Sequence, residues 1–405
     1  MMISEIRLIN YKKFLCERIP LEPFTVFVGP NGSGKSTVAS AIHGVATIMR
    51  LGLNAAFPEV FFSFDRLINH NAEKFGYKNA PMGFGISGGT DHFCWDYDIL
   101  FCKDADSPSG FFIHYEGLKL RDGQSSFHCS SGEHPPIDPV LPTKGGDRNQ
   151  LPRDSARDSL FMQTEKGKDR SDPVLHNNLK KIRRYMQRFI TYRFSPPSAI
   201  RKGCDRYFGD EHQPLLKPDG SNMAQIVQYL QESRKSLLPR FREWIAEYAE
   251  GEARIADVSV AAYGDKVFLN FYEQGKQGRI FPVAEPLISD GFWVFAAMAC
   301  LASCEVVPTA AFFEEPESHL HPHKLPLLYE LFKAMVKREK DPCQILISTH
   351  SPYFLDLFKE TPDSVILLNQ GKAKRLSDIE DYERILSLYT LGESWYSDVF
   401  TWGNP

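Results

Sequence analysis

The stretch Gly29-Pro30-Asn31-Gly32-Ser33-Gly34-Lys35-Ser36 decides the fold class of this 405-residue chain. Its spacing, G-x-x-x-x-G-K-S, is that of a phosphate-binding loop. Glycine lets backbone N–H groups turn inward without a Cβ in the way, and such amides at a helix start bind anionic phosphate. An apolar strand is predicted before the loop, at 24–28, and a helix after it, at 37–49. The order strand, loop, helix therefore predicts a nucleotide site rather than a chance glycine turn.

Within this loop, the side chains have separate predicted roles. Lys35 would reach the β- and γ-phosphates, and the hydroxyl of Ser36 would hold Mg²⁺. ATP and Mg²⁺ are thus the predicted cofactors. The residues predicted to contact ATP are Asn31, Gly32, Ser33, Gly34, Lys35, Ser36 and Thr37.

The composition is that of an ordinary globular protein, with 42% hydrophobic and 24% charged residues. A net charge of −4 gives no global argument for nucleic-acid binding, although it leaves room for a local basic patch. The eight cysteines include no C-x-x-C pair, so no zinc framework is predicted. No apolar run approaches the roughly 20 residues that span a membrane, and no secretory signal is recognisable. We therefore expect a cytoplasmic protein with reduced thiols and no membrane partner.

Strands alternate with helices near both ends of the chain, which predicts an α/β fold with a largely parallel sheet. Three local predictions concern the remaining parts: an opening strand over 3–15 with a turn at 11–14, a polar loop over 121–173, and a helix over 177–192. Four segments are expected: an ATPase lobe I (1–120), a polar loop with a helical, basic insertion and hairpin (121–275), an ATPase lobe II (276–375), and an aromatic C-terminal segment (376–405).

A second constellation lies at 309–317, where an apolar strand ends in two carboxylates. Glu314 is predicted to hold the Mg²⁺ shell, and Glu315 to polarise the attacking water as general base. The first position usually holds Asp, so the longer Glu314 is a departure from the pattern. The alternative is a pair of solvated acids at a strand end, which the nearby phosphate loop disfavours.

Two shorter motifs add to this pattern. His350 lies in Ile347–Pro352, at the end of the next predicted strand, where it would sense a γ-phosphate. Ser289 and Gly291 come just before an apolar helix, so a hydroxyl and a backbone amide at a helix start would bind phosphate. A single His is usually a packed residue and Ser-Asp-Gly is a common turn. The order of the motifs is more specific than any one of them.

Taken in order, these motifs resemble the ABC-type ATPases of the RecF and SMC class. More narrowly, the chain is similar to the prokaryotic AAA-family ATPases of the OLD-related group, which occur in anti-phage systems of the Septu, PARIS and retron-associated kinds. Further support comes from the opening at 8–14 and from the stretch at 216–222. The resemblance implies an ABC-type P-loop NTPase head with a mixed or parallel sheet, a β-rich first lobe, a helical insertion and no long coiled coil.

The same resemblance implies a head-to-tail dimer, or a higher oligomer, with ATP between the heads. Lys35 and Ser36 of one chain would bind the nucleotide, and Ser289 and Gly291 of another would cap it in trans. His350 would contact the γ-phosphate, and residues 319–322 would lie at the same interface. The glutamine that follows the first lobe in this family is not identified, and the candidates are Gln124, Gln150 and Gln163.

The stretch 180–202 contains eight Lys or Arg and no Asp or Glu. With aromatic residues interleaved, it is a candidate nucleic-acid or partner surface, with cations on phosphates and rings on bases. The alternative is a solvated helix face followed by a core strand. The cations proposed for this surface are Lys180, Lys181, Arg183, Arg184 and Arg188. The aromatic stretch at 386–402 is either a partner contact or simple packing.

The predicted function is that of an ATP-hydrolysing regulatory subunit of an anti-phage defence complex. Association of its heads would hold or activate a separately encoded effector, expected to be a nuclease, because no nuclease motif is recognisable in this chain. The alternative is a RecF-like repair or recombination ATPase that acts directly on DNA. A transporter ATPase subunit is less favoured, because the Ser-Asp-Gly signature and the opening are of the RecF-like kind.

Overall fold

The computed structural model describes residues 1–53, 66–69, 81–103, 111–122, 125–131, 149–150, 173–206, 214–249, 255–275 and 278–397. They belong to two compact units, one made of residues 1–189, 361–382 and 401–405, the other of 190–360 and 383–400. The chain leaves each unit and returns to it, so these units do not coincide with the four segments expected from sequence. The α/β class is confirmed, with both parallel and antiparallel strand pairs.

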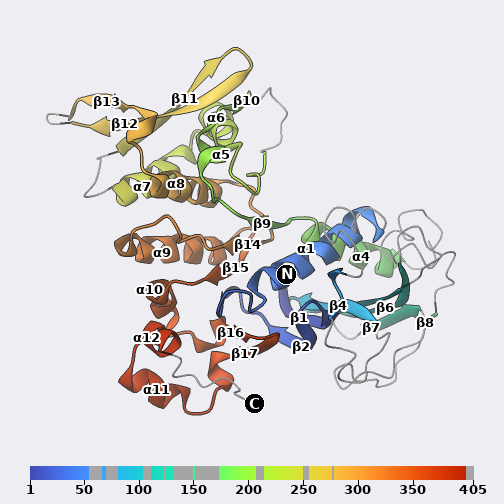
Figure 1. Cartoon of the computed structure of the whole chain (residues 1–405). Coiled ribbons are helices and arrows are strands. Elements are labelled where there is room, and N and C mark those ends of the chain that lie inside the picture. Colours follow the sequence, from blue (N-terminus) through green and yellow to red (C-terminus); the bar gives the residue numbers. More distant parts are fainter. Residues whose placement is uncertain are drawn as a thin grey trace. The chain divides into compact units, whose positions relative to one another are not determined.

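The first unit contains a seven-stranded sheet with the order β2-β1-β4-β5-β6-β7-β8 (Figure 1). Its strand pairs are antiparallel except for β7 and β8. Helices α1 and α4 lie over one face of this sheet. The bounds are β1 Met2–Tyr11, β2 Phe14–Pro20, β4 Met82–Gly89, β5 Phe93–Lys103, β6 Phe111–Asp122, β7 Ser125–Ser131, β8 Asn149–Gln150, α1 Lys35–Leu51 and α4 Pro173–Met186.

Three local predictions need correction in this unit. The opening strand over 3–15 is two strands joined by a turn at the predicted place, where Lys12 adopts a positive φ of 51° and the chain turns back into β2. The loop predicted over 121–173 contains β7, a polar strand that pairs with β6 through backbone hydrogen bonds and needs no apolar pattern. The helix predicted over 177–192 ends at Met186, and the aromatic and β-branched stretch after it forms β9 (Phe189–Tyr192).

Three further strands of the first unit position the phosphate loop. β3 (Phe24–Val28) is the strand predicted before the loop, and it pairs in parallel with β16 (Val365–Asn369). β17 (Lys372–Arg375) pairs with β16 in the antiparallel sense. The side chains of Val26, Phe27 and Val28 are buried, so the strand that leads into the loop is held within the core.

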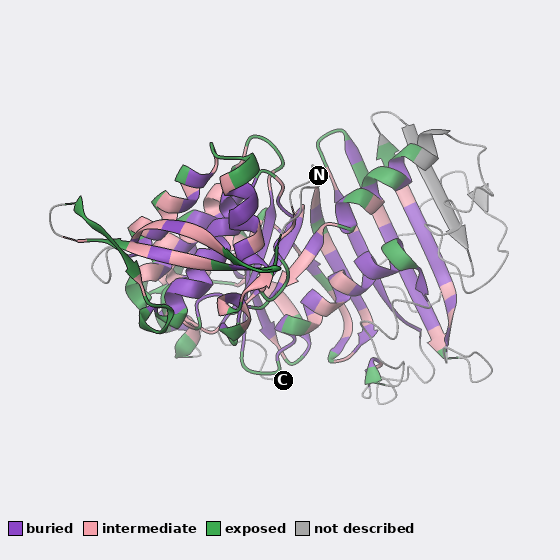
Figure 2. Cartoon of the chain, turned by 90° about the horizontal axis from the view of Figure 1, so that it is seen from above, coloured by how far each residue is buried: buried purple, intermediate pink, exposed green. Residues whose placement is uncertain are grey.

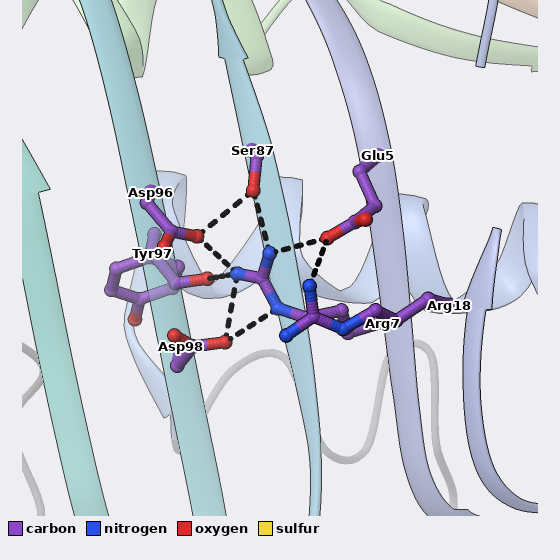
Figure 3. A network of polar contacts seen from close by, with 7 residues as sticks. All are labelled: Glu5, Arg7, Arg18, Ser87, Asp96, Tyr97 and Asp98. Carbon is purple, nitrogen blue, oxygen red and sulfur yellow. Dashed lines mark hydrogen bonds and ion pairs between the residues drawn. The ribbon is translucent and has the colours of Figure 1, made fainter. Parts of the chain in front are cut away.

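A buried polar network crosses the other face of the seven-stranded sheet (Figure 3). The guanidinium of Arg7 on β1 donates to Asp98 on β5 at 3.0 and 2.9 Å and to Glu5 at 2.8 Å. It also donates to Asp96 and to the hydroxyl of Ser87. Burial raises the pKa of Asp98 to about 6, although Arg7 opposes this shift. Arg7 therefore faces three carboxylates, of which Asp98 is the most deeply buried, and Arg18 forms a second ion pair with Glu5 at 3.8 Å.

In the second unit, β14 and β15 are parallel neighbours with α9 between them in sequence, and β9 lies beside β14. A smaller antiparallel sheet has the order β10-β12-β11, with β13 also paired to β12. The bounds are α5 Ser198–Arg201, β10 Cys204–Asp205, α6 Met223–Ser233, α7 Leu238–Ala249, β11 Ile255–Tyr263, β12 Lys266–Gln274, β13 Ile280–Val283, α8 Asp290–Ser303, β14 Ala310–Glu314, α9 Leu325–Val336, β15 Gln344–Thr349, α10 Pro352–Leu355, α11 Tyr382–Leu388 and α12 Leu391–Tyr396.

Helix α8 forms much of the core of the second unit. Its residues from Gly291 to Ser303 are all buried, and Figure 2 shows how far burial extends through the described elements. Tyr248 of α7 stacks on Phe295 with ring centroids 4.6 Å apart and meets Phe292 edge-on at 5.8 Å. A helix buried on every side can move little, so the residues at its N-terminus have a well-defined position.

Candidate functional site

The phosphate loop connects β3 to α1 within the first unit, in the predicted order. Its shape depends on glycine at two places. A Cβ on Gly34, whose φ is 120°, would lie 2.6 Å from the ring of Phe14. A Cβ on Gly29 would lie 2.1 Å from the carbonyl oxygen of Leu368 on β16. Larger residues at these positions would therefore displace the loop from the strands that hold it.

The interior of the loop suits an anion. Nζ of Lys35 donates to the carbonyl oxygens of Gly29 at 2.7 Å and Pro30 at 3.2 Å, so the ammonium lies over the loop. Helix α1 begins at Lys35, has no acidic residue in its first turn, and has no side-chain cap on its first amides. The Oγ atom of Ser33 is buried and has no hydrogen-bond partner among the described residues. Ser36, three residues further along the chain, is exposed. These groups fit the phosphates of ATP and a hydroxyl ligand for Mg²⁺.

Two lysines, one beside the loop and one beside helix α1, were not predicted as site residues. The turn between β1 and β2 carries Lys12 and Lys13. A Cβ on Gly32 would lie 3.1 Å from Nζ of Lys13, so this ammonium is adjacent to the loop. Lys12 donates to Oγ of Ser40 on α1 at 3.2 Å, and burial lowers its pKa. Paired lysines just before Phe14 were the available signal, but the sequence alone indicated only a turn there.

The acidic half of the predicted site lies in the second unit, at the carboxyl ends of β14 and β15. Glu314 is the last residue of β14, and Glu315 follows with a positive φ of 44°. Oε1 of Glu315 lies 3.8 Å from Nε2 of His350, which follows β15. Because parallel strands end at the same edge of a sheet, residues predicted from two separate motifs, the two glutamates and the histidine, come together here.

Glu317 is a buried residue that contacts the turn beside this cluster. It is buried, and Oε1 accepts hydrogen bonds from the hydroxyl of Thr349 and from the backbone N–H of His350, the latter at 3.2 Å. Burial raises the pKa of Glu317, against these two hydrogen bonds. Its contacts hold the turn that carries His350. Glu317 thus positions the histidine, a role that the sequence did not distinguish from those of its acidic neighbours.

Ser289 and Gly291 also lie in the second unit, at the start of α8. Oγ of Ser289 accepts a hydrogen bond from the backbone N–H of Phe292 at 3.2 Å, which caps the helix. A Cβ on Gly291 would lie 2.5 Å from the carbonyl oxygen of His319. Glycine therefore allows the motif that contains His319 to approach the helix start.

Arg201 braces the same turn and was not predicted. It donates to the carbonyl oxygen of Ile288 at 3.1 Å and forms ion pairs with Glu285 and Asp290. Its guanidinium also lies over the ring of Trp293, 5.8 Å from the centroid. One arginine on α5 thus ties together the residues on both sides of Ser289.

The candidate basic surface lies partly on α4. Lys180, Lys181 and Arg184 are exposed, whereas Arg183 donates to the carbonyl oxygen of Arg50 at 2.9 Å and Arg188 is half-buried. The four interleaved rings are buried, so their predicted stacking on bases is wrong: they are Tyr185, Phe189, Tyr192 and Phe194. The cationic part stays a prediction.

The candidates for the family glutamine are not tested. Gln124 and Gln163 lie outside the described residues, and Gln150 belongs to β8 at the edge of the seven-stranded sheet. Among the described helices, none is long and apolar enough to cross a membrane.

The chain is similar to several known proteins. A family model of AAA domains, whose description names an AbiEii toxin and a type IV toxin–antitoxin system, matches residues 24–356. An OLD nuclease of Thermus scotoductus is 50% identical over 370 residues, which are 88% of this chain and 60% of that protein. The chain thus spans 60% of the length of this curated relative.

Two solved structures are similar to the chain at low sequence identity. The SMC head bound to the C-terminal winged-helix domain of ScpA has a TM-score of 0.45 and 13% identity, over 93% of this chain and 97% of that one. The SMC head domain from Thermotoga maritima has a TM-score of 0.43 and 12% identity, over 93% and 99%.

Proposed function

The chain belongs to the AAA-domain family that matches residues 24–356, and on this premise we propose that it is the regulatory ATPase subunit of an anti-phage defence complex. It is an ABC-type ATPase of the OLD-related group. In the proposed role, ATP-dependent association of its heads holds or activates a separately encoded effector, expected to be a nuclease. The proposed location is the cytoplasm, where ATP is available.

The observation that carries the proposal is the placement of Glu315 beside His350, 3.8 Å apart at the ends of two parallel strands. Glu315 would accept a proton from the attacking water, and His350 would contact the γ-phosphate. The turn that carries His350 is held by the buried Glu317. A base and a γ-phosphate contact in one rigid cluster support hydrolysis rather than binding alone.

The groups that would hold the nucleotide are those of the phosphate loop. Lys35 and the amides at the start of α1 would bind the phosphates. Ser36 and Glu314 would hold Mg²⁺, the latter with the longer reach of a glutamate. When bound, ATP would supply the phosphoanhydride bond that is cleaved, and Mg²⁺ would neutralise the charge that develops as this bond breaks. The chain's own contribution is to position these groups and to keep the loop in one shape.

The role in trans is proposed for Ser289 and Gly291. Ser289 is exposed, while Gly291 is packed against the carbonyl oxygen of His319. A buried helix with an exposed, capped N-terminus is a suitable group for contacting phosphate on a second chain. We infer a head-to-tail dimer, or a higher oligomer, in which each nucleotide is contacted by two chains.

The proposed coupling to a toxic effector is supported by the description of the matched family and by the name of a similar protein. The matched family description names a toxin and a toxin–antitoxin system, and the relative from Thermus scotoductus is named a nuclease. In our proposal the hydrolytic switch belongs to this chain and the destructive activity to its partner. The ATP-bound and hydrolysed states would then differ in whether the heads are associated.

The test combines this chain with a nuclease encoded beside its gene. Purified together, they should show nucleic-acid cleavage that changes with ATP and is held in one state by Glu315→Gln. The chain alone should hydrolyse ATP slowly and leave plasmid, single-stranded DNA and RNA intact with Mg²⁺ or Mn²⁺. Cleavage that copurifies with the chain alone and survives Lys35→Ala would contradict the proposal.

A second candidate function is a RecF-like ATPase acting directly on DNA. It is favoured by the exposed cations Lys180, Lys181 and Arg184 on α4. In that case, DNA affinity should fall steeply with salt and fall further when Lys180 and Arg184 are changed to Glu. Binding that ignores both changes would exclude α4 as the DNA surface.

A further inference from the structure

An arginine lies beside the last residue of β14. Nε of Arg193, the residue after β9, is 3.9 Å from Oε2 of Glu314. We propose that Arg193 binds the γ-phosphate of ATP, and that Arg193 forms its ion pair with Glu314 while the nucleotide is absent. This inference rests on the proposed ATPase site and adds a residue to it.

Ring packing sets the positions of both residues. Tyr192 and Phe194, the two neighbours of Arg193, both pack against Phe313, the residue before Glu314. The Tyr192 and Phe313 rings stack with centroids 5.1 Å apart, and those of Phe194 and Phe313 are 6.3 Å apart. All three rings are buried. The register between Arg193 and Glu314 is therefore a consequence of core packing, not of their own weak attraction.

The backbone of Arg193 is anchored as well. Its N–H donates to the carbonyl oxygen of Pro218 at 2.9 Å. The segment around Pro218 is itself closed by Asn222, whose side chain accepts from Lys217 N–H at 2.8 Å and donates to the carbonyl oxygen of Leu215 at 2.9 Å. The backbone from which the Arg193 side chain extends is thus held in a defined position.

The guanidinium, in contrast, is held loosely. The side chain of Arg193 is 71% exposed, and Glu314 is its ion-pair partner among the described residues. An ion pair with one well-exposed partner contributes little to stability, so this one is readily exchanged. An anchored backbone with an exposed guanidinium suits a residue that changes its ion-pair partner, rather than one that stabilises the fold.

Binding of Mg²⁺ by Glu314 would take away the counter-ion of Arg193. The released guanidinium would then pair with phosphate oxygens, for which its planar set of N–H donors is well matched. Among the phosphates, the γ-phosphate is the one whose transfer Glu314 and Glu315 are placed to assist. Arg193 would neutralise charge on the group being transferred, which is how arginine accelerates phosphoryl transfer.

The experiment compares Arg193→Ala and Arg193→Lys with Arg234→Ala. Arg234 is a matched control, since it forms an exposed ion pair with Glu305 at 2.9 Å in the same unit. Affinities for ADP and for a non-hydrolysable ATP analogue are measured with Mg²⁺ by displacement of a fluorescent nucleotide. Arg193→Ala should weaken the analogue about 10-fold and ADP less than about 2-fold, because ADP lacks the γ-phosphate.

Hydrolysis at saturating ATP provides the second measurement. Arg193→Ala should lower kcat by about 10²–10³-fold, somewhat below the usual effect of an arginine finger, and Arg193→Lys should recover part of the loss. Arg234→Ala should match the wild type in both measurements. Equal analogue-to-ADP affinity ratios in Arg193→Ala and the wild type would overturn the proposal and reduce Arg193 to a surface ion pair.

Failure of the underlying ATPase proposal would look different. In that case the wild type itself would show no Mg²⁺-dependent hydrolysis, or Lys35→Ala would bind the analogue as well as the wild type does. If the wild type hydrolyses ATP and Lys35→Ala does not bind it, the ATPase proposal stands. The analogue-to-ADP affinity ratio of Arg193→Ala then decides whether Arg193 binds the γ-phosphate.

Discussion

The backbone N–H of Glu315 donates a hydrogen bond to the carbonyl oxygen of Ser348 at 3.0 Å. This bond continues the pairing of β14 with β15 one residue past the end of β14. Glu315 there has a φ of 44°, which is uncommon for a residue with a side chain and costs about 1 kcal/mol or more. The tie to Ser348 helps to keep that conformation, and it aims the carboxylate toward His350.

Glu315→Gln should therefore leave ATP binding nearly intact and slow hydrolysis by about 10²–10⁴-fold, the usual contribution of a general base. The amide keeps the size of the side chain and loses its basicity. ATP should also trap the variant in its associated form, which size-exclusion chromatography with light scattering would detect. Normal turnover in this variant would show that another group is the base.

Lys35→Ala should abolish tight ATP binding, because it removes the ammonium that lies over the phosphate loop. A nucleotide titration by calorimetry measures this directly. Lys372→Ala is the control, since the exposed Lys372 pairs with the half-buried Glu17 at 2.7 Å in the same unit. The control should bind ATP as the wild type does. An unchanged affinity in Lys35→Ala would remove the loop from the nucleotide site.

Ser289→Arg should leave ATP binding by the isolated chain nearly intact and block hydrolysis, because a bulky cation would occupy the contact proposed in trans. Mixing this variant with Lys35→Ala should restore part of the activity, since one composite site would then have both intact contributors. The rate of the mixture against each variant alone is the measurement. Full activity of Ser289→Arg alone is incompatible with the head-to-tail arrangement.

Asp98 should make stability depend on pH. Its folded-state pKa of about 6 exceeds the ordinary value of 3.8, so between these limits the folded chain binds more protons than the unfolded chain. The stabilising contribution of Asp98 is complete below pH 4 and is lost as the pH rises through 6. Over that range the free energy of unfolding should fall by up to about 3 kcal/mol relative to Asp98→Asn.

Urea unfolding of the wild type and Asp98→Asn at several pH values between 4 and 7 measures this difference. Asp363→Asn serves as a control, because Asp363 is exposed and forms an ion pair with Arg375 at 3.5 Å. A difference for Asp98→Asn that does not change with pH would mean that Asp98 is ionised throughout, as a full partner of Arg7.

The sequence by itself determined the parts of this protein whose chemistry is local. A loop that requires glycine and lysine at set positions, and a buried strand that ends in carboxylates, are visible because each depends on residues close together in the chain. The strand before the loop, α8, β14 and β15 follow for the same reason, since each is a strongly apolar run. The prediction at 177–192 was wrong because a basic helix and an aromatic strand adjoin there without a glycine or proline between them.

Tertiary structure decided which distant residues meet these motifs. The sequence near Arg193 does not predict that Glu314 lies beside it. Their pairing depends on the packing of three buried rings, those of the two residues that flank Arg193 and of Phe313. The position of Lys13 near Gly32 and the contacts of Arg201 near Ser289 also could not be predicted from sequence. The partner of a long side chain depends on which residues the fold brings close to it. Local motifs are encoded in short stretches, whereas the partners of exposed cations follow only from the packing of buried side chains elsewhere.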